Sequence, residues 1–269
     1  MTTAVGDIPE TAAASGCPAA LRGHGRGTSG WVHSWDLSTG VYGPGTRLVV
    51  FLAGCPLRCL YCHNPDTWVR TDGGVETLLD EVERLFVRYR PFIRAAGGGF
   101  TVSGGEPLQQ PAFTRRLLQA ARAAELHTAL DTSGFLGRRA DDRLLDATDL
   151  VLLDIKAGTD EGHRRITGRP IGPTLEFARR LAQRGQKTWV RYVLVPGFTD
   201  DLGEIDAFSE LVSGLGNVER VDVLPFHTLG AGKYAQLGIP FPLADAPTPS
   251  RELLVSVRER MTAAGLTVF

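Results

Sequence analysis

Three cysteines within eight residues are the feature of this 269-residue sequence that most clearly points to chemistry. Cys55, Cys59 and Cys62 follow the spacing C-x3-C-x2-C, so one short loop can direct three thiolates toward a common centre. The fourth cysteine, Cys17, is far away in the sequence, and we assign it no role. This pattern suits a metal site far better than a disulfide framework.

Three clustered thiolates leave a metal group incompletely coordinated. Four would saturate a cubane iron–sulfur cluster, whereas three leave one iron open to an outside ligand, as a catalytic zinc keeps one position open. The alternative is a closed zinc site in which His63 completes the set. Zinc ligands usually come as two separated pairs, and this sequence contains no second pair.

A second candidate segment is Ser103-Gly104-Gly105-Glu106-Pro107. Glycines allow the backbone to approach a ligand closely, and the carboxylate of Glu106 can face an ammonium group. Taken alone, the segment is an equally good turn. A binding role is favoured because the segment directly follows an apolar run, and this run is the next one along the chain after the run that precedes the cysteines.

Other apolar runs also finish in polar residues. Asp131 and Thr132 offer oxygen ligands that suit a small monovalent cation or a polar anchor. Asp154 can accept a hydrogen bond from a ribose hydroxyl, and Lys156 can pair with a carboxylate. His227 follows the last run. Each could be a solvated strand end, but strands that share one sheet edge would bring all of them together.

The elements that must position these residues alternate along the chain. Apolar, β-branched runs predict six buried parallel strands, over Thr46–Ala53, Phe100–Ser103, His127–Asp131, Asp149–Asp154, Lys187–Val195 and Glu219–Leu224. Apolar positions at helical spacing predict helices over 78–89, Pro111–Glu125, Thr174–Arg184, Leu202–Ser213 and Arg251–Ala264. This alternation predicts an α/β fold with right-handed crossovers. Six strands are too few for a closed eight-stranded barrel, so we predict a partial, open (βα)6 barrel. An open doubly wound sheet would give nearly the same pattern.

The bulk composition places the chain among ordinary globular proteins. Hydrophobic residues make up 43% and charged residues 22%, and the net charge of −1 favours neither nucleic acid nor an anionic membrane as a partner. No apolar run approaches the roughly 20 residues that span a bilayer, and no secretory signal pattern is present, so we expect a cytoplasmic protein. The near-neutral charge and the lack of heptads lead us to expect a monomer.

Domain organisation is expected to be simple. Residues 1–29 are rich in Ala, Gly and Thr and show no hydrophobic period, which predicts a disordered or weakly ordered leader. Residues 30–269 are expected to form a single domain, because no repeat or long linker divides them.

The cysteine loop, with Tyr61 before its last cysteine, resembles the signature of the radical S-adenosylmethionine superfamily. The resemblance implies a [4Fe-4S] cluster on Cys55, Cys59 and Cys62. In that family the amino and carboxylate groups of S-adenosylmethionine occupy the open iron. An electron from the cluster then releases a 5′-deoxyadenosyl radical, so the cofactors carry the difficult chemistry.

The resemblance extends to one family within it. Cys-Leu-Tyr-Cys-His-Asn-Pro-Asp-Thr-Trp, Gly-Gly-Gly-Phe-Thr-Val-Ser-Gly-Gly-Glu, Leu-Asp-Thr-Ser-Gly-Phe and Trp-Val-Arg-Tyr-Val-Leu-Val-Pro-Gly are similar to segments of the pyruvate formate-lyase activating enzymes. The similarity runs from about Trp31 to Phe269. It implies that the substrate is a glycyl radical enzyme, which loses a hydrogen from one glycine Cα. It also implies flavodoxin or ferredoxin as the electron donor.

The same resemblance assigns residues. Arg191 corresponds to a catalytic arginine near the glycine loop of the partner. The expected contacts of S-adenosylmethionine, taken with the strand ends above, are Tyr61, Cys62, His63, Gly104, Gly105, Glu106, Asp131, Thr132, Asp154, Lys156, Gly158, Thr159, Asp160 and His227.

One departure leaves the partner open. The family usually carries Val-Asp-Gly-Pro-Gly before the first strand, whereas this chain has Tyr42 in place of the aspartate. Activases of several other glycyl radical enzymes contain extra clusters with extra cysteines, which this chain lacks, so pyruvate formate-lyase is the favoured partner. The alternatives are another glycyl radical enzyme, a small-molecule substrate, or a zinc-stabilised interaction module without enzymatic activity.

Overall fold

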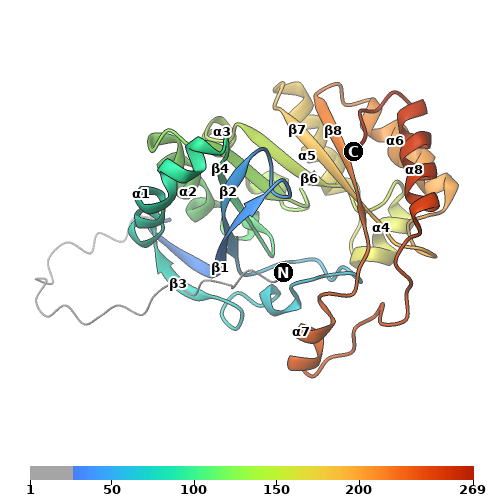
Figure 1. Cartoon of the computed structure of the whole chain (residues 1–269), viewed down its shortest axis with the longest axis horizontal. Coiled ribbons are helices and arrows are strands. Elements are labelled where there is room, and N and C mark those ends of the chain that lie inside the picture. The colour runs from blue at the N-terminus through green and yellow to red at the C-terminus, as the bar shows by residue number, and fades with distance from the viewer. Residues whose placement is uncertain (1–26) are drawn as a thin grey trace, which may run out of the picture.

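The structure, a computed structural model, describes residues 27–269, and these form one eight-stranded sheet flanked by helices (Figure 1). The strand order is β3-β1-β2-β4-β5-β6-β7-β8. The strands are β1 (Ser29–Thr39), β2 (Thr46–Leu52), β3 (Val75–Leu78), β4 (Gly99–Gly104), β5 (His127–Thr132), β6 (Leu150–Asp154), β7 (Thr188–Leu194) and β8 (Val218–Pro225). The predicted leader lies outside the described residues except for its last three positions, where Ser29 begins β1.

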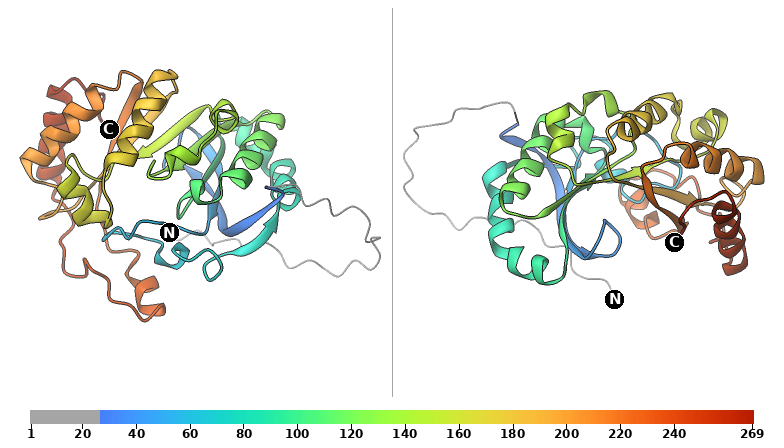
Figure 2. Two further views of the ribbon diagram at one scale, coloured as in Figure 1. Left: turned by 180° about the vertical axis from the view of Figure 1, so that it is seen from behind. Right: turned by 90° about the horizontal axis from the view of Figure 1, so that it is seen from above.

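The six parallel strands are the six predicted from apolar runs, and the predicted partial (βα)6 barrel is confirmed. Strands β2, β4, β5, β6, β7 and β8 pair in parallel with one another in that order. The sheet stays open, because β3 and β8 form its two edges. Most of the helices wrap around the outer side of the curved sheet, as Figure 2 shows from above.

Two antiparallel strands at one edge were not predicted. β1 pairs with both β2 and β3, and the hairpin that joins β1 to β2 spans residues 40–45. The alternation of buried and exposed residues in β1 is broken by a shift in register between Val32 and Ser34. β3 has only four residues, of which Thr77 alone is buried. Short or bulged edge strands leave only a weak periodic signal in the sequence.

Most of the helices also begin and end near their predicted positions. They are α1 (Leu79–Ala95), α2 (Pro111–Ala123), α3 (Asp142–Asp146), α4 (Asp160–Thr167), α5 (Gly172–Gln183), α6 (Leu202–Ser213), α7 (Ala231–Gln236) and α8 (Arg251–Ala263), with 3-10 turns η1 (Pro65–Thr67), η2 (Pro107–Gln109) and η3 (Gly137–Arg139). The unpredicted helices α3, α4 and α7 are short. Within residues 27–269, no helix combines the length and the apolar character needed to cross a membrane.

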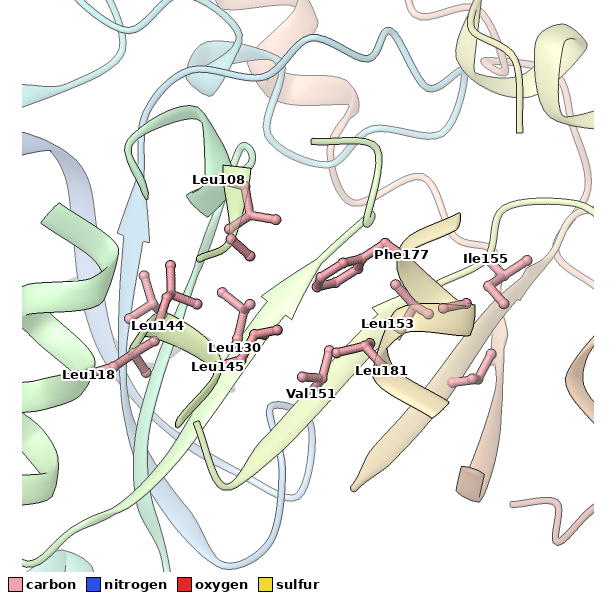
Figure 3. Packing of buried hydrophobic residues seen from close by; sticks show 14 of the residues in the cluster. Leu108, Leu118, Leu130, Leu144, Leu145, Val151, Leu153, Ile155, Phe177 and Leu181 are labelled. Atoms are coloured by element: carbon pink, nitrogen blue, oxygen red, sulfur yellow. The ribbon is translucent and has the colours of Figure 1, made fainter. Parts of the chain in front are cut away.

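Successive side chains along each parallel strand point alternately to the apolar outer face and to the inner face of the sheet. Leu130, Val151 and Leu153 point outward and belong to the main core, where Leu118 of α2 and Phe177 of α5 pack near them (Figure 3). Fully burying a side chain of this size contributes about 1.5–3 kcal/mol. This outer layer keeps the strands in register, so the inward-facing residues of neighbouring strands lie beside one another.

The inner face holds a buried arginine near the amino ends of the strands. Arg47 of β2 is fully buried, and burial lowers its pKa to about 10. Its guanidinium donates to Thr101 Oγ1 at 2.6 Å, to the Phe100 carbonyl at 2.7 Å and to the His127 carbonyl at 3.1 Å. Arg47 therefore ties β2, β4 and β5 together at the end of the sheet away from the pocket described below.

Replacing this arginine should destabilise the fold. Arg47→Met would remove the charged donor that binds the Phe100 and His127 carbonyls, and a hydrogen bond from a charged group contributes about 1.5–3 kcal/mol. We expect urea denaturation to show a decrease of roughly 2–5 kcal/mol in the free energy of unfolding. The exposed Arg84, paired with Asp80 on α1, is the matched control, and Arg84→Met should change stability by less than about 0.5 kcal/mol. Equal effects of the two substitutions would contradict this account.

Candidate active site

A pocket of about 230 Å³ opens at the carboxyl ends of the parallel strands. All three clustered cysteines line it, together with most of the residues predicted from strand ends. The predicted residues in its wall are Cys55, Cys59, Tyr61, Cys62, His63, Gly104, Gly105, Asp131, Thr132, Asp154, Lys156, Arg191 and His227. Glu106, Gly158, Thr159 and Asp160 were predicted as contacts, but they do not line this pocket.

The cysteine loop is held by its own backbone. The Gly54 amide donates to the Thr67 carbonyl at 2.7 Å, and the Cys55 amide donates to the Trp68 carbonyl at 3.1 Å. The Leu60 amide donates to a carbonyl at the end of α4, at 2.9 Å. A segment without regular secondary structure thus has a defined path, which presents its three side chains to the pocket.

Two glycines at the end of β4 allow the cysteine loop to approach the sheet. Gly104 has φ +121°, and a Cβ at this position would lie 2.2 Å from the Leu52 nitrogen. At Gly105 a Cβ would lie 2.6 Å from the Gly54 carbonyl oxygen and 3.2 Å from the Cys55 Cβ. No other residue type fits such contacts. The glycine segment therefore shapes the pocket by bringing β4 against the cysteine loop.

The three thiols are free and partly buried. Burial raises the pKa of Cys55, and it raises the pKa of Cys59 to about 12 even though Lys156 opposes it. A metal group that binds here must therefore displace three protons. Around the thiols lie three buried polar atoms that have no hydrogen-bond partner within the described residues 27–269, namely the hydroxyls of Tyr61 and Tyr234 and Nδ1 of His227. Three sulfur ligands and unused hydrogen-bonding groups fit an iron–sulfur cluster with an additional polar ligand.

His63 does not join the cysteines as a fourth ligand. Its ring stacks on His227 with 4.2 Å between ring centroids, and its Nε2 lies 3.3 Å from the His227 carbonyl oxygen. Within residues 27–269, no three His, Cys, Asp or Glu side chains are arranged to hold a single metal ion. The stacked ring pair instead lines one part of the pocket.

A charge network forms the floor of the pocket. Arg191 of β7 donates to Asp154 Oδ1 at 2.7 Å and forms a short ion pair with Asp131. Lys156 Nζ lies 2.8 Å from Asp154 Oδ2, and Ser103 donates to Asp131 at 2.6 Å. Two carboxylates and two cations balance one another. This balance permits their burial, because an unpaired buried charge is strongly destabilising.

The pairing sets the protonation of the network. Burial by itself would raise the pKa of Asp154, but the Arg191 guanidinium and the Lys156 ammonium hold it at about 2. Burial also lowers the affinity of Arg191 for its proton, and its two carboxylate partners more than offset this and raise its pKa. Asp154 is therefore ionised at neutral pH, and one of its oxygens is already committed to each cation.

Glu106 lies behind the pocket wall. Its carboxylate is fully buried and accepts hydrogen bonds from the Thr132 hydroxyl at 2.7 Å, from the Ser133 amide and hydroxyl at 3.0 and 2.5 Å, and from the Leu108 amide at 3.0 Å. These four donors leave it no free acceptor site toward the pocket. Glu106 thus joins the end of β4 to the end of β5, which places Thr132 in the wall.

Residues 158–160 also lie outside the pocket wall, where they form hydrogen bonds around the start of α4. The amides of Gly158 and Thr159 donate to Glu204 at 2.9 and 3.1 Å, and the Thr159 hydroxyl caps the first turn of α4. Asp160 accepts from Arg164 at 2.6 Å and from the Ile171 amide at 2.9 Å. These contacts hold the start of α4, whose last turn supports the cysteine loop.

Other residues at the site were not predicted. Ser103, Ser133 and Trp68 line the pocket. All three lie within the motif segments quoted above, Ser133 in Leu-Asp-Thr-Ser-Gly-Phe, so adjacency to the predicted residues could have identified them. Tyr234, near the cysteines, has no sequence signal, because α7 is separated from the cysteine loop by most of the chain.

Comparison with known proteins was consistent with this geometry. A family model described as the radical SAM superfamily matches residues 49–208. The chain is 43% identical over 232 residues to the pyruvate formate-lyase 1-activating enzyme of Escherichia coli (strain K12), which covers 85% of this chain and 94% of that protein. A domain of the pyruvate-formate lyase-activating enzyme from Bacteroides vulgatus ATCC 8482 superposes with a TM-score of 0.55 and 26% identity, covering 64% of this chain and 98% of that one. A radical SAM methyltransferase from Sphaerobacter thermophilus has the same fold, with a TM-score of 0.61, 21% identity, and coverage of 83% of this chain and 65% of that one.

Removing one carboxylate from the floor of the pocket should destabilise the protein. Asp154→Asn leaves Lys156 and part of Arg191 unpaired, and the expected loss in the free energy of unfolding is about 3–5 kcal/mol. Lys156→Met should cost less in the Asp154→Asn background than in the wild type, by roughly 0.5–3 kcal/mol. Because the folded pKa of Asp154 lies below its ordinary 3.8, its contribution is complete above that pH and is lost as the pH falls toward 2.

Urea denaturation of the four proteins in this cycle, repeated at several pH values, provides the measurement. Glu176→Gln, which breaks the exposed pair with Arg138, is the control and should change stability by less than about 0.5 kcal/mol. Additive effects of the two substitutions in the pocket would show that Asp154 and Lys156 are not coupled.

Proposed function

Because this chain belongs to the pyruvate formate-lyase activating enzymes of the radical S-adenosylmethionine superfamily, we propose that its pocket activates a glycyl radical enzyme, namely pyruvate formate-lyase. The observation that carries the proposal is the presence of three free thiols, with no fourth ligand among residues 27–269, beside a charge-balanced floor of strand-end residues. The zinc-stabilised interaction module expected as an alternative is wrong, because the chain belongs to a family of enzymes.

We propose that Cys55, Cys59 and Cys62 hold the [4Fe-4S] cluster. When bound, the cluster and S-adenosylmethionine supply a radical that takes a hydrogen atom from a glycine Cα of the partner protein. The chain itself supplies position and electrostatics. The backbone loop fixes the three sulfurs, and the glycines of β4 keep the adjacent wall free of side chains.

The remaining pocket residues are proposed to bind the cosubstrate. Lys156 and Asp154 carry opposite charges into the pocket, and the cosubstrate also has a carboxylate and hydroxyl groups that need such partners. The stacked rings of His63 and His227 offer flat surfaces for adenine. The pocket wall also includes Tyr61, Gly104, Gly105 and Thr132. Glu106 and residues 158–160 support this wall from behind.

Arg191 is proposed to act toward the partner's glycine loop. It is tied to Asp131 and Asp154, so its guanidinium is held in one place at the floor. A monovalent cation near Asp131 belongs to the same proposal. It would have to share that carboxylate with Arg191 and Ser103, which already bind one oxygen each.

The cellular setting is also proposed. An activating enzyme of this kind needs a one-electron donor, for which flavodoxin or ferredoxin is the expected protein. We propose that the chain works as a cytoplasmic monomer that binds its partner transiently. Neither nucleic acid nor a membrane is expected to take part.

One observation favours a second candidate partner. Tyr42, which replaces the usual aspartate of the family, lies close to the floor network. Burial, with Asp131 as the next largest cause, raises its pKa to about 12. An aspartate at this position would add a third carboxylate to the two of the network, whereas the phenol of Tyr42 is neutral. A glycyl radical enzyme whose glycine loop suits a neutral surface there is therefore the alternative substrate.

The decisive experiment is radical transfer. Anaerobically reconstituted protein, dithionite and S-adenosylmethionine should generate a glycyl radical signal in electron paramagnetic resonance when pyruvate formate-lyase is added. A partner whose target glycine is replaced by alanine should give no signal. A radical on another glycyl radical enzyme, with none on pyruvate formate-lyase, would support the second candidate. No radical on any such partner would overturn the proposal.

Substitutions of two different cysteines distinguish an effect on cluster binding from an effect on folding. Cys59→Ala should abolish iron and sulfide uptake while leaving thermal unfolding of the metal-free protein nearly unchanged, because Cys59 is on a loop outside the main core. Cys17→Ala is the matched control, and it should retain full iron and sulfide content. Iron retained by Cys59→Ala, or lost from Cys17→Ala, would contradict the ligand assignment.

A further inference from the structure

A buried hydroxyl beside the cysteine loop has no role in the function described above. Tyr234 of α7 is 1% exposed, and its hydroxyl has no hydrogen-bond partner among residues 27–269. Buried tyrosine hydroxyls normally find an acceptor, because an unpaired polar group is costly in the interior. The unpaired hydroxyl therefore points to an acceptor that is not part of the polypeptide.

The surroundings of Tyr234 indicate where this acceptor lies. Its ring packs edge-on against Trp68, with 6.0 Å between ring centroids and an angle of 85°, and against Phe241 at 4.8 Å. Burial raises the pKa of Tyr234, and the thiols of Cys62 and Cys59 raise it further. Because Trp68 itself lines the pocket with the three cysteines, the phenol lies just behind that part of the pocket wall.

Trp68 lies on the same side of the cysteines and provides a second donor. Its backbone carbonyl accepts a hydrogen bond from the Cys55 amide at 3.1 Å. Trp68 lines the pocket together with the three cysteines, and its indole N–H is the only donor of this side chain.

The helix that carries Tyr234 is fixed to the cysteine loop. Lys233 Nζ lies 2.8 Å from Asn64 Oδ1 and 2.9 Å from Asp66 Oδ2. Just before α7, Gly230 packs so closely that a Cβ would lie 2.9 Å from the His63 Cα. The hydroxyl of Tyr234 is thus held in place relative to the cysteines by contacts on both sides.

We propose that Tyr234 and Trp68 are positioning residues that donate hydrogen bonds to sulfur atoms of the cluster and of its Cys62 ligand, and thereby raise the reduction potential. This inference rests on the proposed function, because it needs a cluster on the three cysteines. Reduction by one electron adds negative charge to the sulfur atoms. Hydrogen bonds to those atoms stabilise the more negative state, and they are among the factors that set the potential of such clusters.

The test is a redox titration of the reconstituted protein. Wild type, Tyr234→Phe, Trp68→Phe and the control Tyr89→Phe are reduced stepwise with dithionite without S-adenosylmethionine, and the reduced cluster is quantified by electron paramagnetic resonance. Tyr89 packs against Trp35 in a different part of the fold, so it controls for loss of a tyrosine hydroxyl in general. Tyr234→Phe and Trp68→Phe should each shift the potential to more negative values, whereas Tyr89→Phe should leave it unchanged. A tenfold change in the reduction equilibrium corresponds to about 59 mV for one electron.

A second measurement detects the hydroxyl proton that Tyr234 is proposed to donate. Electron–nuclear double resonance of the reduced cluster should show an exchangeable proton, lost in deuterium oxide, that is present in the wild type and in Tyr89→Phe but absent from Tyr234→Phe. If Trp68→Phe fails to take up iron, Tyr234→Phe decides the inference, because it removes one oxygen only.

The outcomes separate the two proposals. An unchanged potential and an unchanged proton signal in Tyr234→Phe at full iron content would overturn the inference and leave the proposed function standing. Failure of the wild type to take up iron and sulfide would overturn the proposed function, and this inference with it.

Discussion

The site depends on the mutual neutralisation of buried charges at the carboxyl ends of β5, β6 and β7. Asp131, Asp154 and Arg191 end up side by side because the strands are parallel and their registers place Asp154 directly opposite Arg191. A single buried charge there would be too costly, but two carboxylates shared by a guanidinium and an ammonium form a neutral group. The pocket can therefore be deep and polar without unfolding the sheet that carries it.

A second constraint is the order of the cysteine loop. A segment with three thiols and no regular secondary structure would have many conformations if it were free, and fixing it costs conformational entropy. Here its backbone is paired with residues 67 and 68 and with the end of α4, and α7 is anchored across it through Lys233. The loop is thus held in one conformation by contacts within the protein, which suits a cluster whose open position must face a defined pocket.

The hairpin between β1 and β2 places Tyr42 on the inner face of the sheet. Its ring meets Phe51 edge-on with 5.4 Å between centroids, and it packs against the small inner cluster that includes Ala129 and Leu152. The inner face is thus layered, with Arg47 at one end, apolar side chains in the middle and the charged floor of the pocket above. A neutral residue at position 42 preserves the charge balance of that floor.

The sequence alone determined the six parallel strands, the larger helices and the three cysteines, because apolar periodicity and ligand spacing are local properties. It also indicated the strand-end residues of the pocket, since parallel strands share one edge. Only the tertiary structure decided that Glu106 and residues 158–160 face the protein rather than the pocket, because their hydrogen-bond partners, Ser133 and Glu204, come from other segments. It likewise brought Tyr234 to the cysteines. Which donors surround a sulfur atom depends on how distant segments pack, and no local pattern in the sequence records that.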